Sequence, residues 1–262
     1  MNKGDFVSAI SDASGLTKAD AERAVEGMFK VVKKTLKAGK NPDAIVYEPV
    51  THRIFAFNGD SSDVTAIDAQ SLKVLAASIA APGAPEFAAV DGHGRVYFNI
   101  EDRSELAVLD ARTLKIERHY SLAPCEEPSG LAIDPKGRLY SVCRNGLMIV
   151  SDPSQGRVVG QAPIGHGPDG VAWLDGKAYS ANGRDGTISV VSETSEGRFE
   201  TMATVPTAQG ARTIAAEPEE HLLFTPTADF KPQTASGAAK SSRPEAIAGT
   251  FRVLVLKDAA TR

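Results

Sequence analysis

The sequence predicts a mainly β fold: a partial β-propeller of about five four-stranded antiparallel blades, preceded by an N-terminal two-helix hairpin. The first observation behind this is a repeat. Comparable segments are spaced by 43, 43, 40 and 43 residues, and they begin at Pro42, Pro85, Pro128, Pro168 and Ala211. Four short strands recurring every 40 to 45 residues or so are typical of propeller blades. The second observation is that residues 1–40 lack this repeat and instead carry apolar side chains at three- and four-residue steps, as amphipathic helices do.

The composition indicates an ordinary globular chain, with 42% hydrophobic and 24% charged residues. No window approaches eighteen consecutive apolar residues, and the N-terminus lacks the apolar core of a signal peptide. We therefore expect a cytoplasmic protein with no membrane partner. The net charge of -4 is uneven, because residues 1–40 carry eight basic and five acidic side chains and the remainder 21 basic and 28 acidic. A basic head of this size is too weak to establish nucleic-acid binding.

The first forty residues predict two helices, near residues 3–13 and 18–38. Thr17 followed by Asp20 has the form of a capping box, which places the second helix start near Lys18. Its apolar stripe comprises Ala21, Ala24, Val25, Met28, Phe29, Val32 and Leu36. Short amphipathic helices are not stable alone in water, so we expect this hairpin to dock on another surface.

Residues 1–40 also resemble the opening of HU-type histone-like DNA-binding proteins. The similarity includes the initial Met1-Asn2-Lys3, the Gly15-Leu16-Thr17 junction and the run that begins at Ala21-Glu22. In that family the two helices form the dimerisation body, which implies self-association through residues 1–40. The family's DNA-contacting sheet and basic arm do not follow Lys40, so any nucleic-acid contact should be weak. It would use the basic stripe of Lys30, Lys33, Lys34, Lys37 and Lys40.

The repeat predicts five blades over residues 42–84, 85–127, 128–167, 168–210 and 211–262. Within a blade an apolar strand leads through a tight turn to a second strand, and the third strand ends at an Asp in three blades: Asp68, Asp110 and Asp152. We expect each of these side chains to accept backbone N–H bonds in the turn before the fourth strand. Residues 231–248 are rich in Pro, Ser and Ala, which predicts a long loop before a final strand over 250–256.

Residues 41–262 resemble the YncE-like, YVTN-repeat propellers. The stretches that carry this resemblance begin at Asn41-Pro42-Asp43, at Ala123-Pro124-Cys125 and at Gly210-Ala211-Arg212. Propellers of that family usually have more than five blades and an export signal. The helical hairpin stands where two earlier blades would be expected, so closure of the ring is an open question.

A candidate ligand site follows from propeller geometry. The loop leading into each blade and the loop between its second and third strands open on one face, which we call the funnel face. The residue after the leading Pro is acidic in three blades, so its carboxylate should point toward the central channel. The candidate site comprises Asp43, Glu86, Glu126, Glu127, His166, Asp169 and Arg212. It suits a cation or an amine-bearing ligand, and the alternative interpretation is solvated loop charges with turn-forming roles.

No catalytic motif accompanies this face. The chain has no Gly-rich phosphate loop, no HExxH and no Gly-x-Ser-x-Gly, and we predict no catalytic residue, metal site or cofactor. Cys125 and Cys143 could pair, but we expect two buried thiols in a cytoplasmic chain. The predicted function is non-enzymatic binding or scaffolding, with an unknown protein or small ligand at the funnel face. The alternatives are an HU-like nucleic-acid-associated protein and, more weakly, a redox or cofactor-binding propeller.

Overall fold

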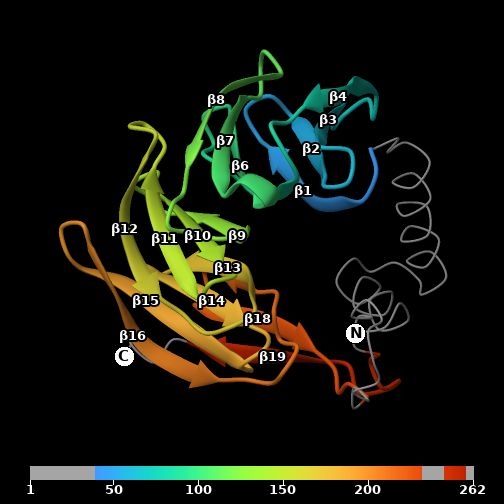
Figure 1. Cartoon of the computed structure of the whole chain (residues 1–262). Helices are drawn as coiled ribbons and strands as arrows, with labels where there is room; N and C mark the ends of the chain where they lie inside the picture. Colours follow the sequence, from blue (N-terminus) through green and yellow to red (C-terminus); the bar gives the residue numbers. More distant parts are fainter. Residues whose placement is uncertain (1–38, 232–244, 258–262) are drawn as a thin grey trace, which may run out of the picture.

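A computed structural model describes residues 39–231 and 245–257 (Figure 1). These residues form five antiparallel sheets. The hairpin predicted near residues 3–13 and 18–38 lies outside the described residues, and so do Lys30, Lys33, Lys34 and Lys37. The five-blade propeller itself is confirmed.

Each of the first four segments forms one four-stranded sheet. The first sheet contains β1 (Pro42–Glu48), β2 (Arg53–Asn58), β3 (Asp63–Asp68) and β4 (Val74–Ala80). The second contains β5 (Pro85–Val90), β6 (Arg95–Ile100), β7 (Glu105–Asp110) and β8 (Lys115–Ser121). The third contains β9 (Pro128–Ile133), β10 (Leu139–Cys143), β11 (Leu147–Asp152) and β12 (Arg157–Pro163). The fourth contains β13 (Pro168–Leu174), β14 (Lys177–Asn182), β15 (Thr187–Ser195) and β16 (Arg198–Pro206).

The fifth sheet corrects the prediction of four strands in every blade. Within the described residues it contains three: β17 (Ala215–Glu217), β18 (Leu222–Thr227) and β19 (Arg252–Lys257). Among the described residues after β18, β19 pairs with β18 along its length, from Arg252 opposite Thr227 to Lys257 opposite Leu222. In the fifth sheet, β19 therefore occupies the position of the third strand.

The sheets follow one another around an arc, with the first sheet at one end and the fifth at the other (Figure 1). Their first strands, β1, β5, β9, β13 and β17, pack against one another in succession and form the inner wall. Among the described residues, no contact of similar extent joins the first sheet to the fifth. The described sheets thus form an arc with two end faces.

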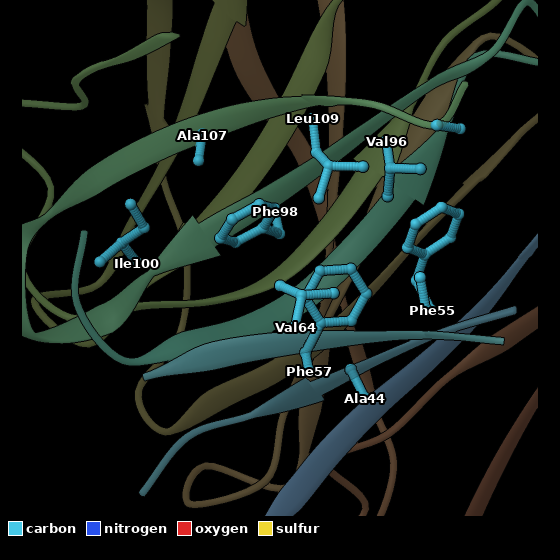
Figure 2. Close-up of a cluster of buried hydrophobic side chains, with 11 residues drawn as sticks. Ala44, Phe55, Phe57, Val64, Val96, Phe98, Ile100, Ala107 and Leu109 are labelled. Carbon is cyan, nitrogen blue, oxygen red and sulfur yellow. The ribbon is translucent and has the colours of Figure 1, made fainter. Parts of the chain in front are cut away.

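Apolar side chains between successive sheets form the core. Because side chains alternate along a strand, Phe55 and Phe57 of β2 face the second sheet and meet Phe98 of β6 (Figure 2). The rings of Phe57 and Phe98 lie 5.1 Å apart between centroids. Full burial of one such side chain stabilises the fold by about 1.5–3 kcal/mol. Three similar clusters join the second to the third sheet, the third to the fourth, and the fourth to the fifth.

Carboxylates cap the turns on the face opposite the funnel, which we call the turn face. The predicted role of the third-strand Asp residues is confirmed: Asp68 accepts the Ser71 N–H at 2.6 Å, and Asp110 accepts the Thr113 N–H at 2.7 Å. Asp152 does the same for Ser154 at 2.8 Å.

A second set of turn-face carboxylates, which the sequence did not single out, caps the turns between the first two strands. Glu48 accepts the Thr51 N–H at 2.8 Å, and Asp91 accepts the His93 N–H at 2.7 Å. Asp134 accepts the Lys136 N–H at 2.9 Å. Both kinds of turn therefore use a carboxylate as a backbone cap.

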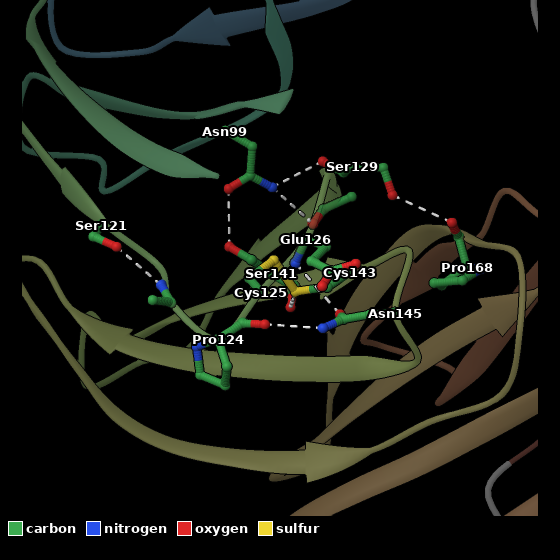
Figure 3. Close-up of a disulfide and its surroundings, with 12 residues drawn as sticks. Asn99, Ser121, Pro124, Cys125, Glu126, Ser129, Ser141, Cys143, Asn145 and Pro168 are labelled. Carbon is green, nitrogen blue, oxygen red and sulfur yellow. Dashed lines mark hydrogen bonds between the residues drawn. A yellow bond between two sulfur atoms is a disulfide. The ribbon is translucent and has the colours of Figure 1, made fainter. Parts of the chain in front are cut away.

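Cys125 and Cys143 form a disulfide, with their Cα atoms 5.4 Å apart, so the expectation of two thiols was wrong (Figure 3). A bulge in β10 pairs Cys143 with Pro128, three residues after Cys125. The bond joins the loop before β9 to the end of β10.

Candidate functional site: the acidic funnel face

Three carboxylates converge where the inner strands begin. Asp43, Glu86 and Asp169 each follow the leading Pro of β1, β5 and β13. These strands belong to the inner wall, so their first side chains lie near the channel. The charges of Asp43 and Asp169 both raise the pKa of Glu86, which shows that the three groups are close enough to interact.

Glu86 forms a carboxyl pair with Glu101, the first residue of the short 3-10 helix Glu101–Arg103. Burial raises the pKa of Glu86 to about 7, together with the charges of Glu101, Asp43 and Asp169. Burial also raises the pKa of Glu101, with a further contribution from Glu127, while Arg144 and a hydrogen bond from Glu86 oppose the rise. The pair therefore holds one proton between two carboxyl groups near neutral pH.

Two arginines stand at the margin of this group. Arg144 forms an ion pair with Glu127, and Arg212 Nε lies 3.2 Å from Asp169 Oδ2. Both arginines are exposed, so each ion pair contributes little stability. Within the described part of the chain, no ion pair joins Asp43, Glu86 or Glu101 to a basic side chain.

The remaining candidates are placed apart from this group. Glu126 is exposed, and its main chain contacts Asn145 and Arg144. His166 is exposed and pairs with Asp185, with Nδ1 3.1 Å from Oδ2.

Other funnel-face carboxylates accept hydrogen bonds from neighbouring groups of the protein. Asp102 accepts the Ala84 N–H at 2.8 Å, and Asp63 accepts hydrogen bonds from Asn58 and Ser78. Glu101 was not among the residues predicted for the site. The signal that could have found it is its position immediately after β6, the strand that pairs with the Glu86 strand in the same blade.

The Cys125–Cys143 disulfide holds a loop of the funnel face in place. It anchors the loop that carries Glu126 and Glu127, and the Arg144 N–H donates to the Glu126 carbonyl at 2.8 Å. Nearby, Asn99 of the second sheet donates to the Ser129 carbonyl at 2.8 Å and accepts from Ser141 Oγ at 2.9 Å (Figure 3). These bonds fix the third sheet against the second beneath the carboxyl pair.

A hollow of about 590 Å³ lies on the turn face between the second and third sheets. Its carboxylates are Asp91, Asp134 and Asp152, and each already accepts backbone N–H bonds in its own turn. Arg138 is likewise bound to Asp134 and Glu193. The hollow therefore offers fewer unsatisfied charges than the funnel face.

No group of three or more His, Cys, Asp or Glu side chains in residues 39–231 and 245–257 is arranged to hold a metal ion. In the same residues no helix has the length and apolar character needed to cross a membrane.

Known proteins match the first residues of the chain and the propeller separately, which are the two parts that the sequence predicted. Residues 1–43 match the family described as bacterial DNA-binding protein. The DNA-binding protein HRL18 of Rhizobium leguminosarum is 51% identical over 39 residues, which are 15% of this chain and 43% of that protein. The DNA-binding protein HRm of Rhizobium meliloti is 46% identical over 39 residues, which are again 15% of this chain and 43% of that protein. The chain thus spans less than half the length of these relatives, and the HU-like resemblance of its first residues is confirmed.

The solved structures match the propeller. Hydrazine synthase of Kuenenia stuttgartiensis has a TM-score of 0.67 at 19% identity, covering 84% of this chain and 64% of that chain. The WD40 repeats of RRP9 have a TM-score of 0.59 at 16% identity, covering 71% and 57%. A streptogramin B lyase has a TM-score of 0.61 at 14% identity, covering 71% and 62%. At these identities the likeness concerns the fold alone, and at that level it confirms the propeller resemblance.

Proposed function

We propose that this chain is a non-enzymatic binding scaffold whose funnel face takes a ligand bearing an amine or guanidinium group. The observation that carries the proposal is the Glu86–Glu101 carboxyl pair, with Asp43 and Asp169 close enough to act on Glu86. Neighbouring carboxylates oppose the ionisation of Glu86, and a ligand cation beside Glu86 would relieve that repulsion. The rigid sheets behind them hold the carboxylates in place before any ligand arrives.

The chemistry of the pair makes binding depend on pH. Glu86 holds a proton below its pKa of about 7, and a cation favours the form in which that proton is lost. Binding should therefore release a proton at pH 6 and almost none at pH 8. With a pKa of about 7, the deprotonated fraction of Glu86 rises about tenfold between these two pH values.

Isothermal titration with spermidine, used as a probe cation, tests the proposal. We expect affinity about tenfold higher at pH 8 than at pH 6, following the deprotonated fraction of Glu86. Glu86→Gln should bind spermidine more weakly at pH 8 and lose the pH dependence. Glu117→Gln removes an exposed carboxylate from β8 of the same blade and is the matched control, which should bind as the unaltered chain does. Equal binding by Glu86→Gln and the unaltered chain would contradict the proposal.

A second candidate function is association with nucleic acid through residues 1–43. It is favoured by the family match and by the 51% identity to a DNA-binding protein over 39 residues. Of the five lysines in the predicted stripe, Lys40 lies within the described residues and is exposed. The few contacts available predict weak, salt-sensitive binding, falling by about 0.9 log units per log unit of salt for each phosphate contact. A gel-shift titration at two salt concentrations, with and without neutralised Lys33, Lys34 and Lys37, measures it.

A further inference from the structure

The first sheet has one face that looks away from the rest of the propeller. Phe55 and Phe57 of β2 face the second sheet, so Ile54, Ala56 and Asn58 face the opposite way. The strand register extends this outer face onto the neighbouring strands: Ile45 and Tyr47 of β1, and Asp63, Thr65 and Ile67 of β3. In the second to fifth sheets the equivalent face packs against the preceding sheet. The first sheet has no preceding sheet.

The centre of this outer face is nevertheless buried. Ala56 and Thr65 are 0% exposed and Ile67 is 1% exposed, although none of them belongs to the four clusters between the sheets. Within residues 39–231 and 245–257, no other sheet makes an extensive contact over β2 and β3 on this side. Ile45 and Tyr47 at the inner edge remain 54% and 49% exposed. On this outer face, the burial therefore concerns residues of β2 and β3 and not those of β1.

Gly39 and Lys40, the first described residues of the chain, lie beside this outer face. The Lys40 N–H donates to Ser61 Oγ at 2.9 Å. Gly39 lies so close that a Cβ there would be 2.6 Å from Asp63 Oδ1 and 2.9 Å from the Cβ of Asn58. Asn58 and Asp63 form the polar end of the outer face, and Asn58 Oδ1 is buried without a hydrogen-bond partner in the described part of the chain. The residues that precede Gly39 therefore start from a point pressed against this face.

We propose that residues 1–38 dock on the outer face of the first sheet, over β2 and β3, and take the place of a preceding blade. The segment has the required chemistry, because its apolar stripe runs from Ala21 to Leu36 at helical spacing. At 100° per residue, Lys30, Lys34 and Lys37 fall on the opposite side of that helix from the stripe. Docking through the stripe buries apolar residues against Ala56 and Ile67 and leaves the lysines facing solvent.

Hydrogen–deuterium exchange of the full chain, read by mass spectrometry, tests the docking. Phe29→Asp puts a charge into the apolar stripe, and we expect exchange of residues 53–68 to quicken about tenfold as the cover loosens. Exchange in residues 139–151 of the third sheet should not change. Lys30→Asp alters the neighbouring residue on the opposite side of the predicted helix and is the matched control, with no change in either segment. Unchanged exchange of residues 53–68 in Phe29→Asp would overturn the proposal.

A measurement on the unaltered chain covers the case in which Phe29→Asp fails to fold. An amine-reactive cross-linker should join Lys18 or Lys30 to Lys73, which is exposed in the turn before β4 of the same sheet. In a mixture of isotopically light and heavy chains, these links should join residues of equal isotope only. Mixed links would mean that a second copy covers the face, and links from Lys18 and Lys30 to lysines of other sheets alone would mean that the segment lies elsewhere. Either result would overturn the proposal.

Discussion

Carboxylates lie on both faces of this propeller, and the pKa values of Asp68 and Asp110 on one face shift in the opposite direction from those of Glu86 and Glu101 on the other. On the turn face the Ser71 hydroxyl lowers the pKa of Asp68, and the Thr113 N–H lowers the pKa of Asp110. On the funnel face burial and neighbouring carboxylates raise the pKa of Glu86 and of Glu101. The difference teaches that a carboxylate within reach of its own turn's N–H groups is a structural cap, whereas one crowded by other carboxylates, as Glu86 is, is the kind on which the proposed ligand site depends.

The largest expected effect comes from a fully buried turn-face carboxylate. Asp134 accepts Arg138 Nε at 2.7 Å and the Tyr140 hydroxyl at 3.2 Å, besides two backbone N–H groups. Asp134→Ala leaves these donors unpaired, so we expect the free energy of unfolding to fall by about 3–5 kcal/mol. Urea denaturation measures it. A loss below about 1 kcal/mol would mean that Asp134 is not a structural cap, and it would contradict the distinction between the two faces.

Removing the disulfide should have the next largest effect. Cys125 and Cys143 are 18 residues apart, and closing a loop of that length stabilises a fold by about 3 kcal/mol. The Cys125→Ser, Cys143→Ser double variant should lose about that much and weaken spermidine binding, because the loop carrying Glu127 is released. Denaturation under oxidising conditions and titration of the same sample measure both effects. If stability falls while spermidine binding is unchanged, the bond supports the fold and not the funnel face.

A smaller effect is expected for one exposed turn cap. Asp110→Ala removes two hydrogen bonds to backbone N–H groups, which should cost about 1 kcal/mol at pH 7. The folded-state pKa of Asp110 is lowered, so its contribution is present above its unfolded pKa and is lost as pH falls through the folded value. Denaturation at pH 7 and at low pH should therefore separate the variant from the parent only at pH 7. A constant difference across this range would show that the cap does not act through its charge.

A last effect has the opposite sign. The pKa of Glu86 is raised, so the folded state holds its proton more tightly and stability falls as pH rises from the unfolded value of 4.5 to about 7. Glu86→Gln removes this ionisation and should make the protein more stable than its parent at pH 8, with little difference near pH 4. Thermal unfolding at the two pH values measures it. A variant less stable than its parent at pH 8 would show that the carboxylate is a structural group.

The sequence predicted what depends on local pattern and missed what depends on packing. The Pro-led repeat predicted the blades, and Asp68, Asp110 and Asp152 were recognised as caps because their partners lie within three residues. The register shift that brings Cys143 opposite Pro128 leaves no trace in residue spacing. The pairing of Glu86 with Glu101 depends on the irregular register between β5 and β6, which places Pro85 opposite Ile100.

The titration of Glu86 itself tests the central claim most directly. Its side-chain carboxyl carbon can be followed by NMR in protein labelled at glutamate, with Glu86→Gln used to assign the signal. We expect a midpoint near pH 7, because burial and three neighbouring carboxylates oppose ionisation, and a lower midpoint when spermidine is added. A midpoint near the ordinary value of 4.5, unmoved by spermidine, would mean that the funnel-face carboxylates are solvated separately and form no site.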